Sequence, residues 1–151
     1  MATVSKRVEE PHGARLYNGD CMRQAEFHRL YCEMPEDYRA ELIGGIVFEP
    51  SPVSNFHGTG HADLGYLLKS YSVATPGTKV GVAVTVILSD EDEVQPDGVL
   101  RIAQECGGKS SVSPEGYITG PPEMVAEVAY SSRAIDLHLK KARYALAGIV
   151  E

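Results

Sequence analysis

The sequence predicts a mixed α/β domain in which a central mixed sheet is flanked by helices. Segments with helical spacing of apolar residues alternate with short segments rich in β-branched residues, and the order is helix, hairpin, helix, three or more strands, helix. The chain of 151 residues is long enough to bury one core. Its hydrophobic content of 43% and charged content of 23% are ordinary for a globular protein.

Composition excludes several classes of protein. A membrane-spanning helix needs about 20 apolar residues, and no apolar run approaches that length. The N-terminus also lacks the apolar core of a signal peptide. We therefore expect a soluble, cytoplasmic protein without a membrane partner. The cysteines form no CxxC pair, which argues against a zinc finger or a disulfide framework. A net charge of −7 disfavours non-specific nucleic-acid binding, but a local basic patch and a metal ion would still permit a nuclease.

The N-terminal third is predicted to contain an arm, a helix and a hairpin. Residues 1–20 show no clean period and contain Pro and Gly, so they are interpreted as a loose arm before a single domain over 21–151. Residues 21–31 have helical spacing. Residues 39–50 form two apolar pieces around Gly44-Gly45, which is typical of a tight hairpin.

The middle of the chain is predicted to contain a helix and two strands. Residues 57–73 form the helix, and its buried face is expected to consist of Leu64, Leu67, Leu68 and Tyr71. Residues 79–88 predict a central strand covered on both faces, and residues 94–102 the next strand, with Pro96 at an edge, a start or a bulge. The acidic run 90–93 is interpreted as a solvated loop, since it lacks the spacing of a calcium loop.

The last third ends in a strand and a helix. After a loop over 104–115, residues 124–130 are apolar except for one glutamate and predict a buried strand. Ser131 or Ser132 is expected to cap the final helix, which ends at Gly148. The inward face of that helix is predicted to hold Ile135, Leu139, Ala142 and Leu146.

Two carboxylates stand out, because they lie in apolar surroundings. A buried Glu127 would cost several kcal/mol unless it is paired, protonated or bound to metal, although an outward position on a one-sided strand remains an alternative. Asp97 alone fits an ordinary Pro-Asp-Gly turn. Together on adjacent strands they would form an oxygen-ligand site suited to Mg²⁺ or Mn²⁺.

Other residues could complete this site or lie on the surface. Lys140 could orient a water or stabilise a transition state, and Glu41 could be a third carboxylate, but a solvated helix face and an outward strand position are the alternatives. His57 and His61 share a helical face, yet no HExxH motif accompanies them, so a zinc site is disfavoured. His57 is instead expected to contact DNA or the site.

Several ordered motifs resemble the Uma-type putative restriction endonuclease family, a domain of unknown function in the PD-(D/E)XK phosphodiesterase superfamily. The motifs are residues 36–45 (EDYRAELIGG), 51–58 (SPVSNFHG), 94–97 (VQPD), 124–129 (MVAEVA), 131–132 (SS), 136–140 (DLHLK) and 144–151 (YALAGIVE). The resemblance implies a restriction-endonuclease-like fold and a bacterial, DNA-cleaving hydrolase that often forms a homodimer. It implies Asp97 and Glu127 as metal ligands, with Glu41 as a third acidic position.

Two departures from the family pattern matter. The superfamily lysine should fall at position 129, which is Ala129, and Lys140 from the following helix is expected to replace it. Members of the family also continue beyond the position of Glu151, so the chain is expected to be shortened at its C-terminal end.

Two functions follow from these residues. The first is a Mg²⁺- or Mn²⁺-dependent endonuclease in which Asp97, Glu127 and Glu41 hold the metal and Lys140 assists the attacking water. Contacts to backbone phosphates of DNA are then expected from Arg133, Lys141, Arg143 and His57. The alternative is a catalytically degenerate member that acts as a nucleic-acid-binding or oligomerisation module.

Overall fold

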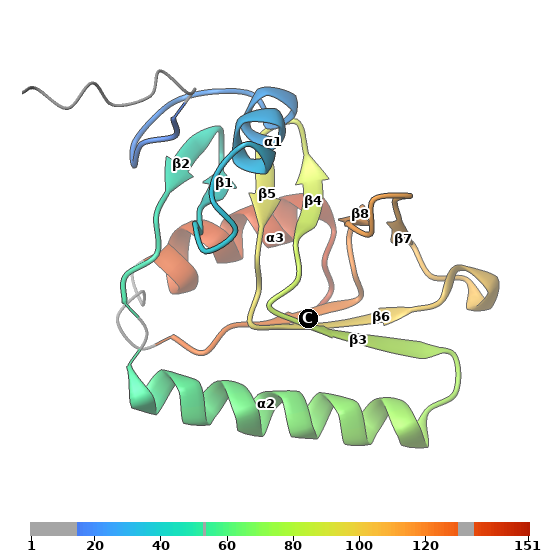
Figure 1. The fold of residues 1–151 in the computed structure, drawn as a ribbon. Helices are drawn as coiled ribbons and strands as arrows, with labels where there is room; N and C mark the ends of the chain where they lie inside the picture. Colours follow the sequence, from blue (N-terminus) through green and yellow to red (C-terminus); the bar gives the residue numbers. More distant parts are fainter. Residues whose placement is uncertain (1–14, 53, 130–134) are drawn as a thin grey trace, which may run out of the picture.

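The computed structural model describes residues 15–52, 54–129 and 135–151, with side chains from residue 138 onward in the last segment. The predicted element order and the mixed α/β class with a central mixed sheet are confirmed (Figure 1). The helices are α1 (Gln24–Cys32), α2 (Asn55–Ala74) and α3 (Lys141–Ala147), and two short turns of other helix types are η1 (Gln104–Cys106) and the π-helical η2 (Ile135–Lys140).

The strands form two sheets. The larger has the order β2-β1-β5-β4-β8-β7 and the smaller has the order β3-β6-β9. Their bounds are β1 Glu41–Ile43, β2 Ile46–Phe48, β3 Thr78–Val82, β4 Val86–Ser89, β5 Asp92–Val94, β6 Gly98–Ile102, β7 Ser111–Val112, β8 Ile118–Thr119 and β9 Met124–Ala126. The larger sheet is mixed because β4 and β8 are parallel while its other pairs are antiparallel. The predicted hairpin is confirmed as β1-β2, with positive φ at both Gly44 and Gly45.

The prediction of one continuous central strand over 79–88 is wrong. The segment breaks at Ala83, which has a positive φ of 50°, so β3 belongs to the smaller sheet and β4 to the larger one. The predicted strand over 94–102 breaks at the same level, between β5 and β6, where the Ala83 N–H donates to the Asp97 carbonyl at 3.3 Å. The chain therefore passes from one sheet to the other between β3 and β4 and again between β5 and β6. Asp97 lies at the second of these crossings.

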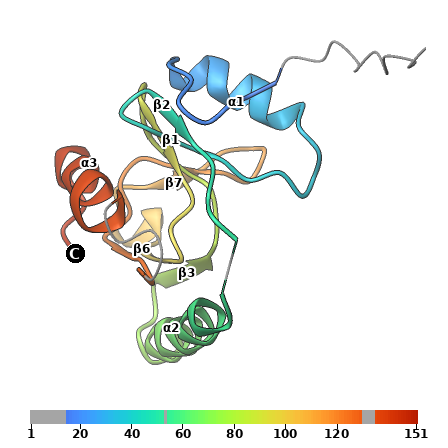
Figure 2. The same ribbon diagram turned by 90° about the vertical axis from the view of Figure 1, so that its left-hand side faces the viewer.

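Helices cover the sheets from different sides. Figure 2 shows α2 along the smaller sheet beside β3, α3 on the flank, and α1 at the far end near β1 and β2. One core cluster joins α1 to the β1-β2 hairpin through Phe27 and Leu42, and a second lies under α3 around Val86, Val99 and Tyr144. Within the described residues, none of the helices combines the length and hydrophobicity of a membrane span.

The predicted inward faces of α2 and α3 are wrong in part. Of the α2 residues, Leu68 is buried, whereas Leu67 and Tyr71 are 64% and 53% exposed, because α2 contacts a sheet of only three strands. On α3, Leu146 is 78% exposed and Tyr144 points inward. A π-helical turn precedes α3, which changes the angular positions of its residues from those of a regular helix.

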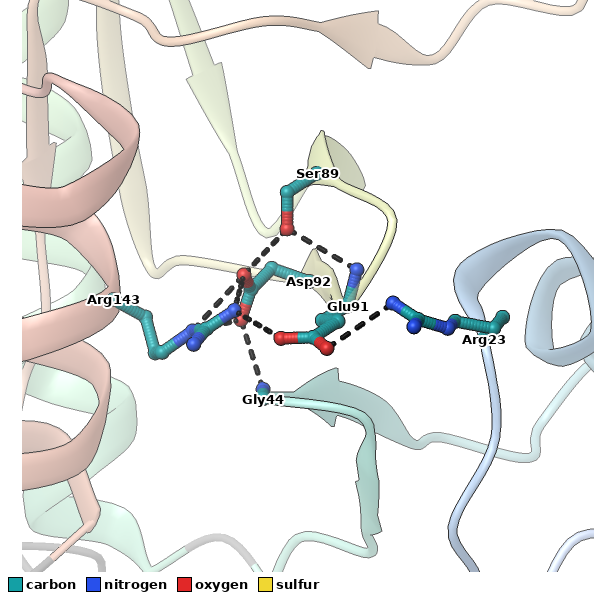
Figure 3. Close-up of polar contacts among 6 residues, drawn as sticks. All are labelled: Arg23, Gly44, Ser89, Glu91, Asp92 and Arg143. Carbon is teal, nitrogen blue, oxygen red and sulfur yellow. Dashed lines mark hydrogen bonds and ion pairs between the residues drawn. The ribbon is translucent and has the colours of Figure 1, made fainter.

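The acidic run 90–93 is not the solvated loop that its composition predicts. Asp92 and Glu93 lie in β5 and are each only 2% exposed. Figure 3 shows Asp92 between Arg143 of α3, Ser89 and the Gly44 backbone. Arg143 Nη2 lies 2.6 Å from Asp92 Oδ2, Ser89 Oγ donates to the same oxygen at 2.6 Å, and Gly44 N donates to Oδ1 at 2.9 Å. These bonds compensate the buried charge.

Replacing Asp92 with asparagine is expected to lower the free energy of unfolding by about 2 to 4 kcal/mol at pH 7, because the partly buried Arg143 guanidinium then keeps only the more exposed Glu91 as a counter-charge. Burial opposes ionisation of Asp92, but the bonds from Arg143, Ser89 and Gly44 outweigh it and hold its pKa below the usual value. This stabilisation is present above about pH 4 and is lost as the pH falls through the lowered pKa. Urea unfolding between pH 3 and pH 7 would measure both effects.

The neighbour Asp90 gives the control for this experiment, since Asp90→Asn removes the same charge at an exposed position. Equal unfolding free energies for Asp92→Asn and Asp90→Asn at pH 7 would show that the buried ion pair has no net stabilising role.

Candidate active site

Three side chains that are far apart in sequence meet below α3. Lys140 is 3% exposed, and its Nζ lies 3.0 Å from Glu41 Oε1 and 2.7 Å from Glu127 Oε1. Glu41 begins β1, Glu127 directly follows β9, and Lys140 ends η2. The side chain of Glu127 is 15% exposed, so the alternative of an outward, solvated glutamate does not hold. The solvated-face alternative for Lys140 is excluded for the same reason.

Tyr144 is a fourth member of this group, and sequence reasoning missed it. Its hydroxyl donates to Glu127 Oε1 at 2.5 Å, and the residue is 7% exposed. Tyr144 follows Lys140 by four positions, which would have placed both on one helical face. The apolar pattern of the helix instead predicts an inward Leu146, which is exposed.

Glu41 is tied to the segment between β5 and β6, which carries Asp97. Its Oε1 accepts the backbone N–H of Gln95 at 2.6 Å, and the Gln95 side chain donates to the Tyr31 hydroxyl at 2.8 Å. A hydrogen bond from a backbone amide fixes the carboxylate without using a second charged side chain. Glu41 therefore bridges Lys140 and the segment between β5 and β6.

The charges in this group are coupled. Burial would lower the pKa of Lys140, but attraction to Glu41 and Glu127 outweighs it and raises that pKa, so the ammonium stays charged at neutral pH. Burial raises the pKa of Glu127, and Lys140 and Tyr144 only partly offset the effect. The Lys140 ammonium thus faces two carboxylates. When both carboxylates are ionised, the excess negative charge favours the binding of a further cation.

Asp97 directly precedes β6, and Glu127 directly follows the neighbouring strand β9. Gly98 of β6 pairs with Ala126 of β9 in an antiparallel register, so Asp97 and Glu127 follow one step beyond at adjacent strand ends. The two Asp97 oxygens have different partners: Oδ2 accepts the Val128 N–H at 2.7 Å, and Oδ1 lies 3.2 Å from His57 Nε2. Asp97 thus has contacts that an isolated turn residue would lack.

Two histidines of α2 converge on Asp97. His61 Nε2 lies 2.9 Å from the Asp97 carbonyl oxygen, and one ligand atom from each of His57, His61 and Asp97 lies within 4.8 Å of the others. Among the described residues, this is the three-residue group whose donor atoms could surround a metal ion. The sequence showed the histidine pair but not its third member, since Asp97 is 36 positions from His61.

Local sequence explains this convergence. Ser54 caps α2 and accepts the His57 N–H at 3.2 Å, so His57 lies in the first turn, at the end nearest Asp97. Gly98 lets α2 approach β6 closely. A Cβ at that position would lie 2.7 Å from Leu68 Cδ1 and 3.0 Å from Leu64 Cδ2.

The residues predicted to contact phosphates differ in their surroundings. Arg143 forms ion pairs with Asp92 and Glu91, and its side chain is 21% exposed, so its charge is already neutralised by these carboxylates (Figure 3).

Of the other residues predicted to contact phosphates, the two that the structure describes have no such ion-pair cluster in common. Lys141 is exposed, and His57 is partly buried against Asp97. Arg133 lies outside the described residues, as do Ser131 and Ser132.

Comparisons with known proteins identify the family and a similar fold. The model of the family Uma2, described as "Putative restriction endonuclease", matches residues 24–151. The fold is similar to a solved structure titled as a putative nuclease belonging to DUF820 from Anabaena variabilis ATCC 29413, with a TM-score of 0.54 and 14% identity. The match covers 75% of this chain and 66% of that chain, so the chain spans about two thirds of its length. A comparison with curated proteins finds no match.

Proposed function

The chain belongs to the Uma2 family of putative restriction endonucleases, and from this we propose that it is a metal-dependent endonuclease that hydrolyses phosphodiester bonds of DNA. The observation that carries the proposal is the buried Lys140 between Glu41 and Glu127, with Asp97 at the strand end next to that of Glu127. A fully packed core could be built from apolar residues, so a buried lysine with two carboxylates points to chemistry.

Three carboxylates supply the ligand chemistry of a divalent cation, but their oxygens do not lie within 4.8 Å of one another as one group among the described residues. Asp97, Glu127 and Glu41 offer carboxylate oxygens, the ligands that Mg²⁺ and Mn²⁺ prefer, and we propose that they hold the ion. Such an ion, when bound, neutralises phosphate charge and acidifies a water. Magnesium or manganese is therefore the proposed cofactor.

The protein residues supply the remaining functions. The Lys140 ammonium, kept charged by its two carboxylates, is suited to orient the attacking water and to stabilise charge that develops on the phosphate. Tyr144 positions Glu127 through its hydroxyl. Lys141, Arg133 and His57 are proposed to contact the DNA, whereas the contribution of Arg143 would compete with its bonds to Asp92 and Glu91.

A homodimer is proposed as the working form, because two copies of the site could then act on the two strands of a duplex. Size-exclusion chromatography with light scattering gives a direct measurement of this state.

A second candidate function is a catalytically degenerate module that binds nucleic acid or assembles with other chains. Ala129 at the position of the superfamily lysine favours it, as does the net charge of −7. The two candidates differ in metal binding, since an ion that binds only the native state must raise its thermal stability. A lack of stabilisation by millimolar Mg²⁺ and Mn²⁺ would favour the degenerate module.

Nicking of supercoiled plasmid DNA tests the proposal. We expect the purified protein to convert supercoiled plasmid to the open-circular form with Mn²⁺ and with Mg²⁺, and EDTA to stop the conversion. Conversion that persists in EDTA would contradict metal dependence. A folded protein that binds metal and DNA without cleaving would point to the degenerate module.

A further inference from the structure

We propose that His57, His61 and Asp97 form a binding site for a late first-row transition-metal ion of the Zn²⁺ and Co²⁺ class. The site stands on the geometry around Asp97. Its use in DNA cleavage would rest on the proposed function, because Asp97 belongs to both groups.

The spacing of the donors supports this site. Ligand atoms that surround an ion at about 2.1 Å lie roughly 3 to 4 Å apart. The three donor atoms here lie within 4.8 Å of one another, and His57 Nε2 is already 3.2 Å from Asp97 Oδ1. The spacing of the donor atoms is therefore close to that of an occupied site.

The positions of the three donors are fixed by the fold. His57 and His61 lie one turn apart on α2, so their rings project from the same face, and the ring centroids are 6.2 Å apart. Val128 N holds Oδ2 of Asp97 at 2.7 Å, which leaves Oδ1 directed at His57. Prearranged ligands lower the entropic cost of binding an ion.

The chemistry of the donors sets the class of ion. Imidazole nitrogens suit Zn²⁺, Co²⁺ and Ni²⁺, whereas Mg²⁺ prefers oxygen ligands only. Two histidines and one carboxylate leave a fourth position for water, which is the pattern of catalytic rather than structural zinc sites. The side chains of His57 and Asp97 are 20% and 16% exposed, so the site is sheltered but open to an ion from solvent.

Without an ion, the Nε2 atoms of His57 and His61 act as hydrogen-bond donors. A carboxylate and a carbonyl only accept, so His57 Nε2 and His61 Nε2 carry their protons toward Asp97. Binding requires the other tautomer of each ring, in which Nδ1 carries the proton and Nε2 faces the ion. Two hydrogen bonds are thus exchanged for two metal bonds.

Cobalt titration of the full chain tests the site without any cleavage assay. We expect Co²⁺ to produce a visible absorption band that saturates at one ion per chain, and excess Mg²⁺ to leave the band in place. His57→Gln and His61→Gln should each weaken Co²⁺ affinity at least about tenfold, which is the lower end of the loss seen even for residues that only support a ligand. The exposed His138 gives a matched control, and His138→Gln should bind as the wild type does.

A second measurement avoids substitutions. With excess Mg²⁺ present to occupy oxygen-ligand sites, substoichiometric Co²⁺, which is paramagnetic, should shift or broaden the ring signals of His57 and His61 in the NMR spectrum before those of His28 and His138. Unchanged Co²⁺ affinity in both folded histidine variants, or displacement of Co²⁺ by equimolar Mg²⁺, would overturn the site. Neither readout involves DNA, so the two proposals can fail separately. Cobalt binding without nicking would contradict the proposed nuclease but not the metal site. Mg²⁺-driven nicking by the histidine variants at the wild-type rate would contradict only the use of this site in cleavage.

Discussion

Substitution of Lys140 by methionine is expected to reduce nicking of supercoiled DNA at least about 100-fold, the loss typical of removing one group that stabilises a transition state. Methionine fills a similar volume, so the main change is the loss of the ammonium that lies 2.7 Å from Glu127 and 3.0 Å from Glu41. The rate of plasmid nicking in Mn²⁺ measures the effect.

Two further variants separate chemistry from folding in this experiment. Lys69→Met removes an exposed lysine of α2 and should leave the rate unchanged. Lys140→Arg keeps the charge but not the compact ammonium, and should recover the melting temperature more fully than the rate. A folded Lys140→Met variant that nicks at the wild-type rate would remove Lys140 from the mechanism.

Replacing Asp97 with asparagine is expected to have an effect of similar size on cleavage, again at least about 100-fold. The substitution keeps the shape of the side chain but removes the negative charge between Val128 N and His57. It should also abolish the stabilisation that metal gives to the wild type, which is about 2.7 kcal/mol at an ion concentration 100 times the dissociation constant. Thermal unfolding with and without Mn²⁺ measures this second effect.

Asp63→Asn gives the matched control, since Asp63 is an exposed carboxylate on α2. We expect it to retain both nicking and stabilisation by metal. If Asp97→Asn were stabilised by Mn²⁺ as strongly as the wild type, Asp97 would not be a metal ligand, whatever the effect on cleavage.

The sequence predicts the fold well where local pattern decides the structure. The β1-β2 hairpin follows from Gly44-Gly45, and the end of α3 from Gly148, which has a φ of 86°. The strand over 79–88 was predicted wrongly because its apolar run continues through the bend at Ala83. Neither composition nor periodicity indicates a strand that changes sheets.

The candidate site was predictable to a different extent. Glu127 and Lys140 stood out as charged residues near apolar ones, and the structure brings them together with Glu41. Whether these residues act as predicted in catalysis stays a prediction. The convergence of His61 on Asp97 depends on how α2 packs against β6, and such long-range packing leaves no periodic signal in one sequence.

The buried acidic residues show why charge runs mislead. The sequence predicts that Asp92 and Glu93 face solvent, because carboxylates seldom lie in a core. Their partners come from distant segments: Arg143 for Asp92, and Gln24 and His28 for Glu93. A buried charge can be predicted only when its partner is known, and the sequence alone does not pair them.

The most direct test of the nuclease proposal compares the wild type with Glu127→Gln in the plasmid assay with Mn²⁺, beside the exposed control Glu115→Gln. The account predicts open-circular DNA from the wild type and from Glu115→Gln, none above background from Glu127→Gln, and none from any protein in EDTA. Equal nicking by a folded Glu127→Gln variant, or intact plasmid after incubation with folded, metal-bound wild type, would contradict it.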